Sequence, residues 1–114
     1  MTNGISGRWA RFSRIVLLAL LAGCGAQGDS APRVHQVVIQ GFGYAPASLE
    51  VAVGDTVVWT NRDVVPHTVT AESRAFDSGS MAMGATWRYV AAEPGSYPYL
   101  CSFHPTMKGM LVVR

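Results

Sequence analysis

Sulfur and imidazole side chains recur at three-residue intervals near the end of the chain. The segment reads Cys-Ser-Phe-His-Pro-Thr-Met, so Cys101, His104 and Met107 bring a thiolate, an imidazole and a thioether into one short loop. A second histidine, His67, directly follows Pro66 earlier in the chain. Soft sulfur ligands combined with imidazole select copper among the first-row metals, and two histidines, one cysteine and a distant methionine form a blue-copper arrangement. These four residues therefore predict one copper ion that cycles between Cu(I) and Cu(II).

Several of these residues also have an ordinary structural explanation. His67 alone could be a histidine at a strand end with no metal, and Met107 could be an apolar cap over the loop. Met110 competes for the methionine position, but it falls inside the last expected strand, where core packing explains it better. We interpret Met81 and Met83 as core or loop packing, with a methionine-rich copper-delivery surface as the alternative.

A count of the remaining ligands disfavours enzymatic activity. A second copper centre would need several more histidines, and only His35, which has no ligand-like neighbour, is left over. A catalytic metal keeps an open coordination position, whereas four protein ligands close the site. Cys101 and His104 could act as nucleophile and base, but no acid is placed to orient the histidine, and Met107 would have no role. We expect no catalytic residues and no enzyme.

Short strands must position these ligands, because the chain after its N-terminal segment shows no 3.6-residue apolar period. Gly54 and Asp55 form a turn signal between alternating runs at residues 48–53 and 55–61, which predicts a hairpin. Seven or eight short strands in total predict an all-β fold, an antiparallel Greek-key sandwich. The other strands are expected around Val37 and Ile39 and at residues 67–71, 86–91, 96–101 and 109–113.

Two further segments of the sandwich can be interpreted locally. Residues 72–85 are the least regular part of the chain, and we expect a long connection there. Tyr97 follows a turn at Glu93-Pro94-Gly95 and precedes Cys101 by four residues. That placement suits a tyrosine corner, in which the phenol bonds back to the backbone. A plain half-buried strand tyrosine is the alternative.

The start of the chain has the pattern of an export signal rather than of a folded element. Three arginines precede an apolar run from Ile15 to Ala22, which is far shorter than the roughly 20 residues of a membrane-spanning helix. We expect residues 1–23 to be a lipoprotein signal peptide, residues 24–33 a lipidated N-terminus and tether, and residues 34–114 the copper-binding domain. This division implies a bacterial protein that is exported to the periplasm or cell surface.

Cys24 is the expected site of lipidation. It ends the run Leu-Ala-Gly-Cys, which has the form of a bacterial lipobox. Acyl chains on this residue would anchor the domain to a membrane, since each buried methylene contributes about 0.8 kcal/mol. An ordinary signal cleaved near a cysteine is one alternative, and a disulfide with Cys101 is another.

The overall basic charge of the sequence belongs to the predicted signal. Removing Arg8, Arg11 and Arg14 from the nine Lys and Arg residues leaves six, against seven Asp and Glu residues. The chain after the signal is therefore close to neutral, with a formal charge of about −1. No basic patch remains to indicate a nucleic-acid partner.

Longer segments around the candidate ligands resemble the cupredoxin family, most closely its amicyanin and plastocyanin branch. The similar segments are Val-Gly-Asp-Thr-Val-Val-Trp at residues 53–59, Asn-Arg-Asp leading to Pro-His-Thr-Val at residues 61–69, Gly-Ser-Tyr-Pro-Tyr at residues 95–99, and the Cys101–Met107 loop. The resemblance covers residues 34–114. It implies that His67, Cys101, His104 and Met107 are the copper ligands.

The resemblance also implies which residues surround the ligands. Asn61, Thr68 and Pro105 fall next to them, and Thr68 stands where amicyanin and plastocyanin usually carry an asparagine. We expect the Thr68 backbone N–H to approach the Cys101 sulfur, with shorter side-chain bracing of the cysteine loop. Changes in such hydrogen bonds alter a metal site's properties.

The same resemblance implies a one-electron carrier. The His104 ring edge would reach the surface inside an apolar rim of Pro66, Phe103 and Pro105, where a c-type cytochrome or a membrane or periplasmic oxidoreductase would dock transiently. The chain would act as a monomer and bind no nucleic acid. A copper chaperone or storage protein is the alternative function.

Overall fold

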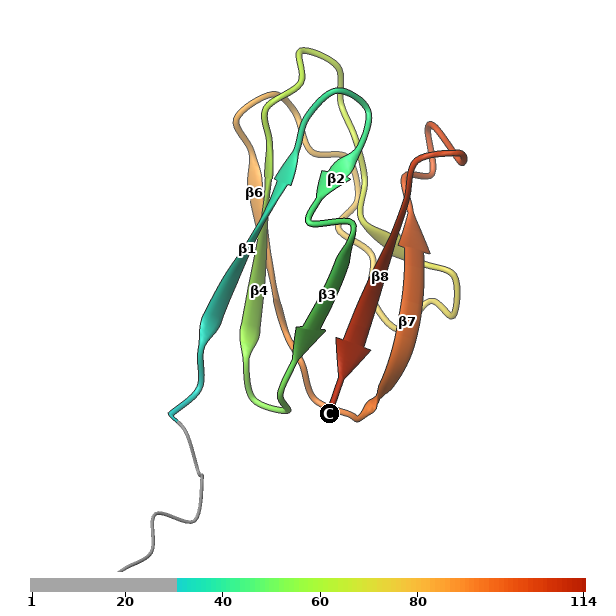
Figure 1. Ribbon diagram of the computed structural model, residues 1–114. Helices are drawn as coiled ribbons and strands as arrows, with labels where there is room; N and C mark the ends of the chain where they lie inside the picture. Colours follow the sequence, from blue (N-terminus) through green and yellow to red (C-terminus); the bar gives the residue numbers. More distant parts are fainter. Residues whose placement is uncertain (1–30) are drawn as a thin grey trace, which may run out of the picture.

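The computed structural model describes residues 31–114, which form a sandwich of two four-stranded sheets (Figure 1). The predicted signal and lipidation site lie outside the described residues. Within this part of the chain there is no helix that could cross a membrane. The eight strands are β1 (Val34–Ile39), β2 (Tyr44–Ala45), β3 (Ser48–Val51), β4 (Thr56–Asn61), β5 (Thr70–Ala71), β6 (Thr86–Val90), β7 (Gly95–Leu100) and β8 (Lys108–Val113).

Both sheets are mixed rather than purely antiparallel. The strand order is β2-β1-β4-β6 in the first sheet and β3-β8-β7-β5 in the second. β1 pairs with β4 in parallel, and β3 pairs with β8 in parallel, whereas the other pairs run antiparallel. The all-β sandwich expected from the sequence is confirmed, but its strands are not all antiparallel.

The predicted hairpin of residues 48–53 and 55–61 is wrong. The turn at Gly54 and Asp55 is present, with a glycine φ of 93° and a bond from the Asp55 N–H to the Ala52 carbonyl. However, it carries the chain from β3 in one sheet to β4 in the other. A turn signal fixes where the chain reverses, while the pairing depends on which neighbours cover each strand's apolar face.

The core lies between the inner faces of the two sheets. Trp59 on β4, Tyr99 on β7 and Leu111 on β8 are fully buried. Trp59 donates its indole N–H to the Tyr99 hydroxyl across 3.3 Å, so the polar end of each ring has a partner inside the core. This contact joins the two sheets at the level of their central strands.

The connection between β5 and β6 closes one open side of the sandwich. β5 covers only Thr70–Ala71, shorter than the strand expected at residues 67–71. His67 instead forms an isolated bridge with Met81, whose side chain is buried. Phe76 from the same connection is also buried against the core. The long irregular segment is therefore confirmed, and it covers the core.

Of the two interpretations of Tyr97, the tyrosine corner is confirmed. The Tyr97 hydroxyl donates to the Glu93 carbonyl four residues earlier, across 2.8 Å. The bond ties the start of β7 to the turn that precedes it.

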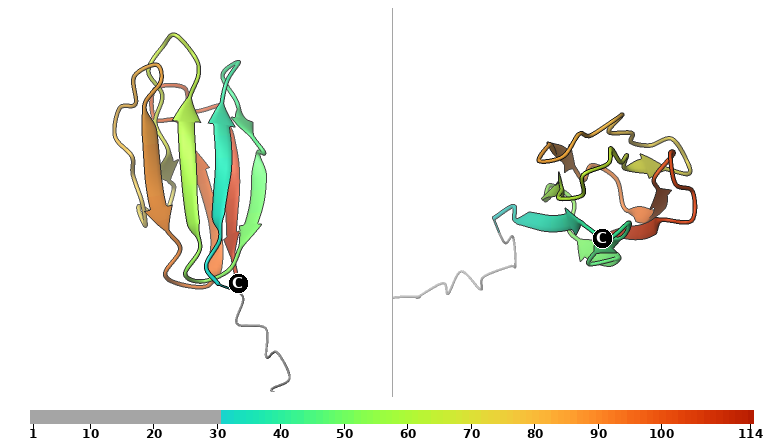
Figure 2. Two further views of the ribbon diagram at one scale, coloured as in Figure 1. Left: turned by 90° about the vertical axis from the view of Figure 1, so that its left-hand side faces the viewer. Right: turned by 90° about the horizontal axis from the view of Figure 1, so that it is seen from above.

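The two ends of the sandwich are occupied by different segments. The β1–β2, β4–β5 and β7–β8 connections gather at one end, the upper end in Figure 1. The C-terminus and the point at which the described chain begins lie at the opposite end (Figures 1 and 2). The candidate ligands sit on the connections of the upper end.

Candidate metal centre

Three predicted ligands converge on one point at the upper end of the sandwich. One ligand atom each from His67, Cys101 and His104 lies within 4.8 Å of the others. Cys101 Sγ is 3.7 Å from His67 Nδ1 and 3.6 Å from His104 Nδ1. His67 and Cys101 are fully buried and His104 is half-buried, so the site opens to solvent on the His104 side.

Successive backbone turns coil the ligand loop between β7 and β8. The His104 N–H donates to the Cys101 carbonyl across 3.1 Å, and the Met107 N–H donates to the His104 carbonyl across 2.9 Å. The Cys101 N–H in turn donates to the Met107 carbonyl across 3.1 Å. Met107 is therefore folded back against Cys101, and its side chain is only 4% exposed.

Thr68 braces the cysteine loop more fully than the sequence suggested. Its backbone N–H donates to Cys101 Sγ across 3.3 Å, as expected. Its hydroxyl oxygen also accepts the Ser102 N–H across 2.7 Å. The Thr68 side chain is short, but it still holds the residue directly after the cysteine.

Asp63 is a site residue that sequence reasoning missed. Its carboxylate accepts a hydrogen bond from His67 Nε2 across 2.7 Å. It also accepts hydrogen bonds from the backbone N–H groups of Gly41 and Phe42, across 2.8 and 2.9 Å. These bonds, with that from Phe42 first, hold the pKa of the Asp63 carboxyl below its usual value despite its partial burial. An ionised carboxylate keeps the proton on Nε2 and turns the Nδ1 lone pair toward Cys101. The available signal was an acid four residues before a candidate ligand.

Phe42 lies against both ligand imidazoles. Its ring meets those of His67 and His104 edge-on, at centroid distances of 5.2 and 5.0 Å. Its backbone has a φ of 56°, which is rare for a bulky residue, and the Asp63 carboxylate holds this conformation. Phe42 is 54% exposed, and its ring lies beside the opening of the site.

The Asn61 side chain bonds to backbone groups near the site rather than to a ligand side chain. This fully buried side chain donates to the carbonyls of Val65 and Met81 and accepts the Asp63 N–H. It therefore shapes the loop that presents Asp63 and His67. The sequence placed Asn61 near the ligands but did not reveal this role.

The other residues considered in the sequence analysis lie in different parts of the fold. His35 pairs with Asp55 across 2.8 Å near the lower end, away from the site. Met81 is buried in the core, whereas Met83 is 62% exposed. The three expected rim residues, Pro66, Phe103 and Pro105, are exposed.

Several known proteins are similar to this chain in sequence. The Cupredoxin-like domain profile matches residues 13–113. The chain is 32% identical over 116 residues to amicyanin from Paracoccus versutus, covering 97% of this chain and 86% of that one. It is 36% identical over 76 residues to amicyanin from Paracoccus denitrificans, a match that spans 62% of this chain and 58% of that protein. The chain belongs to the cupredoxin family.

Solved structures agree with this assignment. An oxidised variant of amicyanin superposes with a TM-score of 0.66 at 34% identity, covering 71% of this cupredoxin and 82% of that chain. A copper-containing nitrite reductase from Thermus scotoductus also gives a TM-score of 0.66, at 30% identity. The match covers 70% of this chain but only 22% of the reductase.

The donor set of this cupredoxin fits copper. A buried thiol and two imidazoles face one point, and copper binds thiolate and imidazole ligands together. His67, Cys101 and His104 are thus positioned as ligands of one copper ion, and the chain is a blue copper electron carrier. When bound, the copper would supply the one-electron chemistry, while the protein holds the ligand side chains in place.

Proposed function

We propose that this cupredoxin carries single electrons between exported or membrane-bound redox partners, and that Met107 would be the fourth residue to hold the copper. The observation that carries the proposal is the convergence of two imidazoles and one thiol on connections that are held in place by hydrogen bonds. The burial of Met107 and its position folded back against Cys101 support its assignment as a ligand. A thioether held at long range is the usual axial ligand of such sites.

The surroundings of the site suit a carrier because they are set by the protein. Asp63 fixes the orientation of His67, Thr68 braces Cys101, and the loop turns fix His104. Ligands held in this way rearrange little when the charge of the ion changes. A small rearrangement favours fast electron transfer in both directions.

Electrons would enter and leave through the half-buried His104 ring. The exposed Pro66, Phe103 and Pro105 form the predicted docking rim, and Phe42 adds a further exposed ring beside His104. Transient redox encounters use small interfaces, below about 1,200 Å² in total, so an apolar rim of this kind is sufficient. Suitable partners are c-type cytochromes or a membrane or periplasmic oxidoreductase. A further relative is a methylamine utilization protein from Methylophilus methylotrophus, 28% identical to this chain.

Export and lipidation complete the proposal. Residues 1–23 would be a lipoprotein signal peptide, Cys24 would carry the lipid, and residues 24–33 would tether the domain of residues 34–114 to a bacterial membrane on its periplasmic or outer side. The described chain begins at the end of the sandwich opposite the ligands (Figure 2). An anchor at that end leaves the docking rim free for a partner.

An enzymatic role is not part of the proposal. Four protein ligands would leave no coordination position for a substrate. Copper chaperoning is the other candidate from the sequence, but a buried, braced Cys101 does not favour easy metal release. The chain is therefore proposed to keep its copper.

One experiment tests the function. Copper is added to the soluble domain, its absorption and EPR spectra are recorded, and the protein is titrated with reduced and oxidised c-type cytochromes. We expect an intense blue colour and reversible one-electron exchange without copper loss. A colourless protein that binds only Cu(I) and releases it readily would instead identify a chaperone.

Replacing the thiolate tests the ligand set. Cys101→Ser substitutes a hydroxyl for the soft ligand, so the blue absorption and the electron exchange should both disappear. The spectrum of the copper-treated variant provides the measurement, with Ser102→Ala as a neighbouring control. A variant that stays blue would disprove the assignment of Cys101.

A further inference from the structure

A line of aromatic side chains begins beside the candidate ligand cysteine. The Thr68 N–H donates to Cys101 Sγ across 3.3 Å, and the Thr68 carbonyl accepts the Tyr44 hydroxyl across 2.6 Å. Tyr44 is 5% exposed, and its ring meets the Tyr99 ring edge-on at a centroid distance of 4.7 Å. The backbone of one residue therefore connects the cysteine sulfur to a buried pair of phenols.

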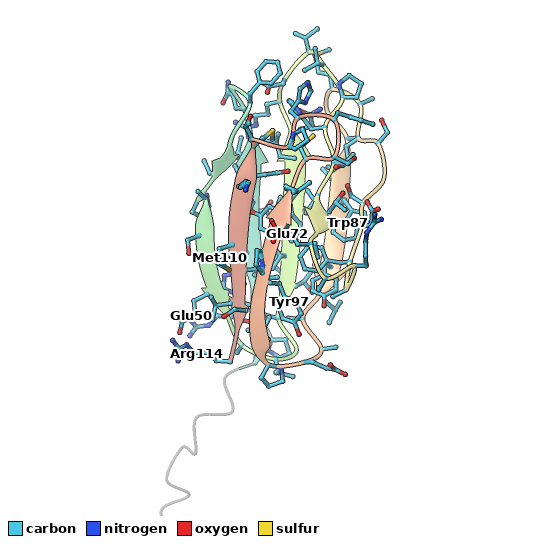
Figure 3. All side chains as sticks on the ribbon, turned by 90° about the vertical axis from the view of Figure 1, so that its right-hand side faces the viewer. Glu50, Glu72, Trp87, Tyr97, Met110 and Arg114 are labelled. Atoms are coloured by element: carbon cyan, nitrogen blue, oxygen red, sulfur yellow. The ribbon has the colours of Figure 1, made fainter. Side chains whose placement is uncertain are left out.

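The line continues through the core to the surface. Trp59 donates its indole N–H to the Tyr99 hydroxyl, and the two ring centroids are 5.7 Å apart. The Trp59 and Trp87 centroids are 5.6 Å apart, and Trp87 stacks on Tyr89 at 6.1 Å with 18° between the ring planes. Trp59 is fully buried, whereas Trp87 and Tyr89 on β6 are half-buried. Trp87 lies opposite Trp59 in the β4–β6 pair and packs against the core from β6, the edge strand of its sheet (Figure 3).

We propose that this line is a second electron route, through which the reduced copper site repairs one-electron oxidation of Trp87 and Tyr89. Indole and phenol groups are among the side chains that strong oxidants attack first. Rings in mutual contact divide the distance to Cys101 into short steps. The inference rests on the proposed function, because it requires a reduced metal ion beside Cys101.

The electrons and protons of the repair reaction balance. A one-electron oxidant, such as the carbonate radical, takes one electron from Trp87 and leaves an indole radical cation. One electron from the reduced site passes through Tyr44, Tyr99 and Trp59 and restores the indole, and any proton lost from its nitrogen returns. In total, the oxidant gains one electron and the copper site loses one. The carrier's ordinary reductant then resets the site.

The test compares protein loaded with Cu(I) and protein loaded with Zn²⁺, which has no redox chemistry. Both are exposed to the same limiting dose of photogenerated ruthenium tris-bipyridine oxidant, and oxidation at Trp87 is quantified by peptide mass spectrometry. We expect several-fold less Trp87 oxidation in the Cu(I) protein, together with the appearance of the blue absorption. Equal Trp87 oxidation in the two forms would overturn the proposal.

Variants separate repair from simple consumption of oxidant at His104. Trp59→Phe interrupts the line but leaves His104 in place, so protection of Trp87 should be lost. Tyr97→Phe is the matched control, because among residues 31–114 the Tyr97 hydroxyl bonds only to the Glu93 carbonyl, and the ring lies outside the line. Protection that survives in Trp59→Phe would reject the route.

A second variant covers a failure of Trp59→Phe to fold. Tyr44→Phe retains the ring and removes only the hydroxyl that bonds to Thr68, so Trp87 protection should fall. Unchanged protection in this variant would then reject the route. A protein that never turns blue with copper would refute the proposed function itself, whereas a blue protein with unprotected Trp87 would refute only the second route.

Discussion

At the scale of single residues, Asp63 holds three parts of the site together. Its carboxylate joins the buried imidazole of His67 to the backbone of Gly41 and Phe42. The negative charge faces the ligand histidine from the side away from the metal position. Carboxylates in this relation orient a ligand and raise its basicity.

Asp63→Asn removes that charge while it keeps the side-chain size. Because a nearby negative charge favours Cu(II) over Cu(I), the reduction potential should rise. Copper affinity should fall by about 10- to 100-fold. Potentiometry and competition with a chelator measure the two effects, with the exposed Glu72→Gln as the control for loss of one carboxylate. An unchanged potential would show that Asp63 only anchors the Gly41–Phe42 turn.

At the scale of elements, the close approach of β7 and β8 positions the ligand loop. Gly109 on β8 lies directly opposite Tyr99 on β7. A Cβ atom at Gly109 would lie 2.2 Å from Tyr99 Cζ, so no side chain fits without moving the buried tyrosine. The two strands that carry the loop therefore depend on this glycine.

Gly109→Ala should lower the free energy of unfolding by about 1–3 kcal/mol, because it overpacks the core. Urea unfolding of the copper-free protein gives the value. Gly43→Ala is a suitable control, since its Cβ would meet only the Gln40 carbonyl at an ordinary 3.7 Å. Equal stability of the two variants would mean that the Tyr99 ring has space to move.

At the scale of the whole molecule, the two ends of the sandwich differ in what they hold. The ligands occupy one end, and Asp55 fastens the entering chain at the other. The Asp55 carboxylate accepts the Arg33 N–H across 2.9 Å, His35 Nε2 across 2.8 Å and the Ala52 N–H across 3.0 Å. This cluster joins the start of β1 to the turn between the two sheets.

These bonds, with that from Arg33 first, lower the pKa of Asp55 to about 2 from an ordinary value of 3.8. A carboxyl whose pKa is lowered by folding stabilises the folded protein at pH values above its pKa in the unfolded chain. This contribution is lost as the pH falls through its pKa in the folded protein. Asp55→Asn should therefore destabilise the protein at pH 7. The difference from the natural chain should shrink between about pH 4 and pH 2.

Unfolding midpoints across that pH range test this prediction. Glu93→Gln is the comparison, because it removes an exposed carboxylate that accepts no side-chain hydrogen bond among the described residues. A destabilisation by Asp55→Asn that is the same at pH 2 and pH 7 would mean that shape rather than charge matters at this position.

Membrane attachment is also a property of the whole molecule. Cys24→Ser should release the protein into the soluble fraction and leave the copper spectrum unchanged, because the ligands lie at the far end. Residues 24–33 reach about 35 Å at most when fully extended, so the domain would stay close to the membrane. Fractionation followed by immunoblotting measures the change. A Cys24→Ser protein that remains membrane-bound would exclude lipidation as the anchor.

The sequence by itself determined the chemistry of the centre and the class of fold. Soft ligands in a short loop select a metal, and strand periodicity and turn residues are local properties that can be read without coordinates. His67, Cys101 and His104 were predicted correctly for this reason. Thr68 was placed correctly, although its hydroxyl bond to the Ser102 backbone was not foreseen.

Only the tertiary structure decided which distant segments meet. β3 and β4 have hairpin spacing but lie in different sheets, because each buries its apolar face against strands far away in sequence. Asp63 and Phe42 become site residues only when the β1–β2 turn folds over His67. The aromatic line likewise joins four strands that no local pattern connects. Pairing and packing between remote segments are set by the whole core, so no spacing along the chain could reveal them.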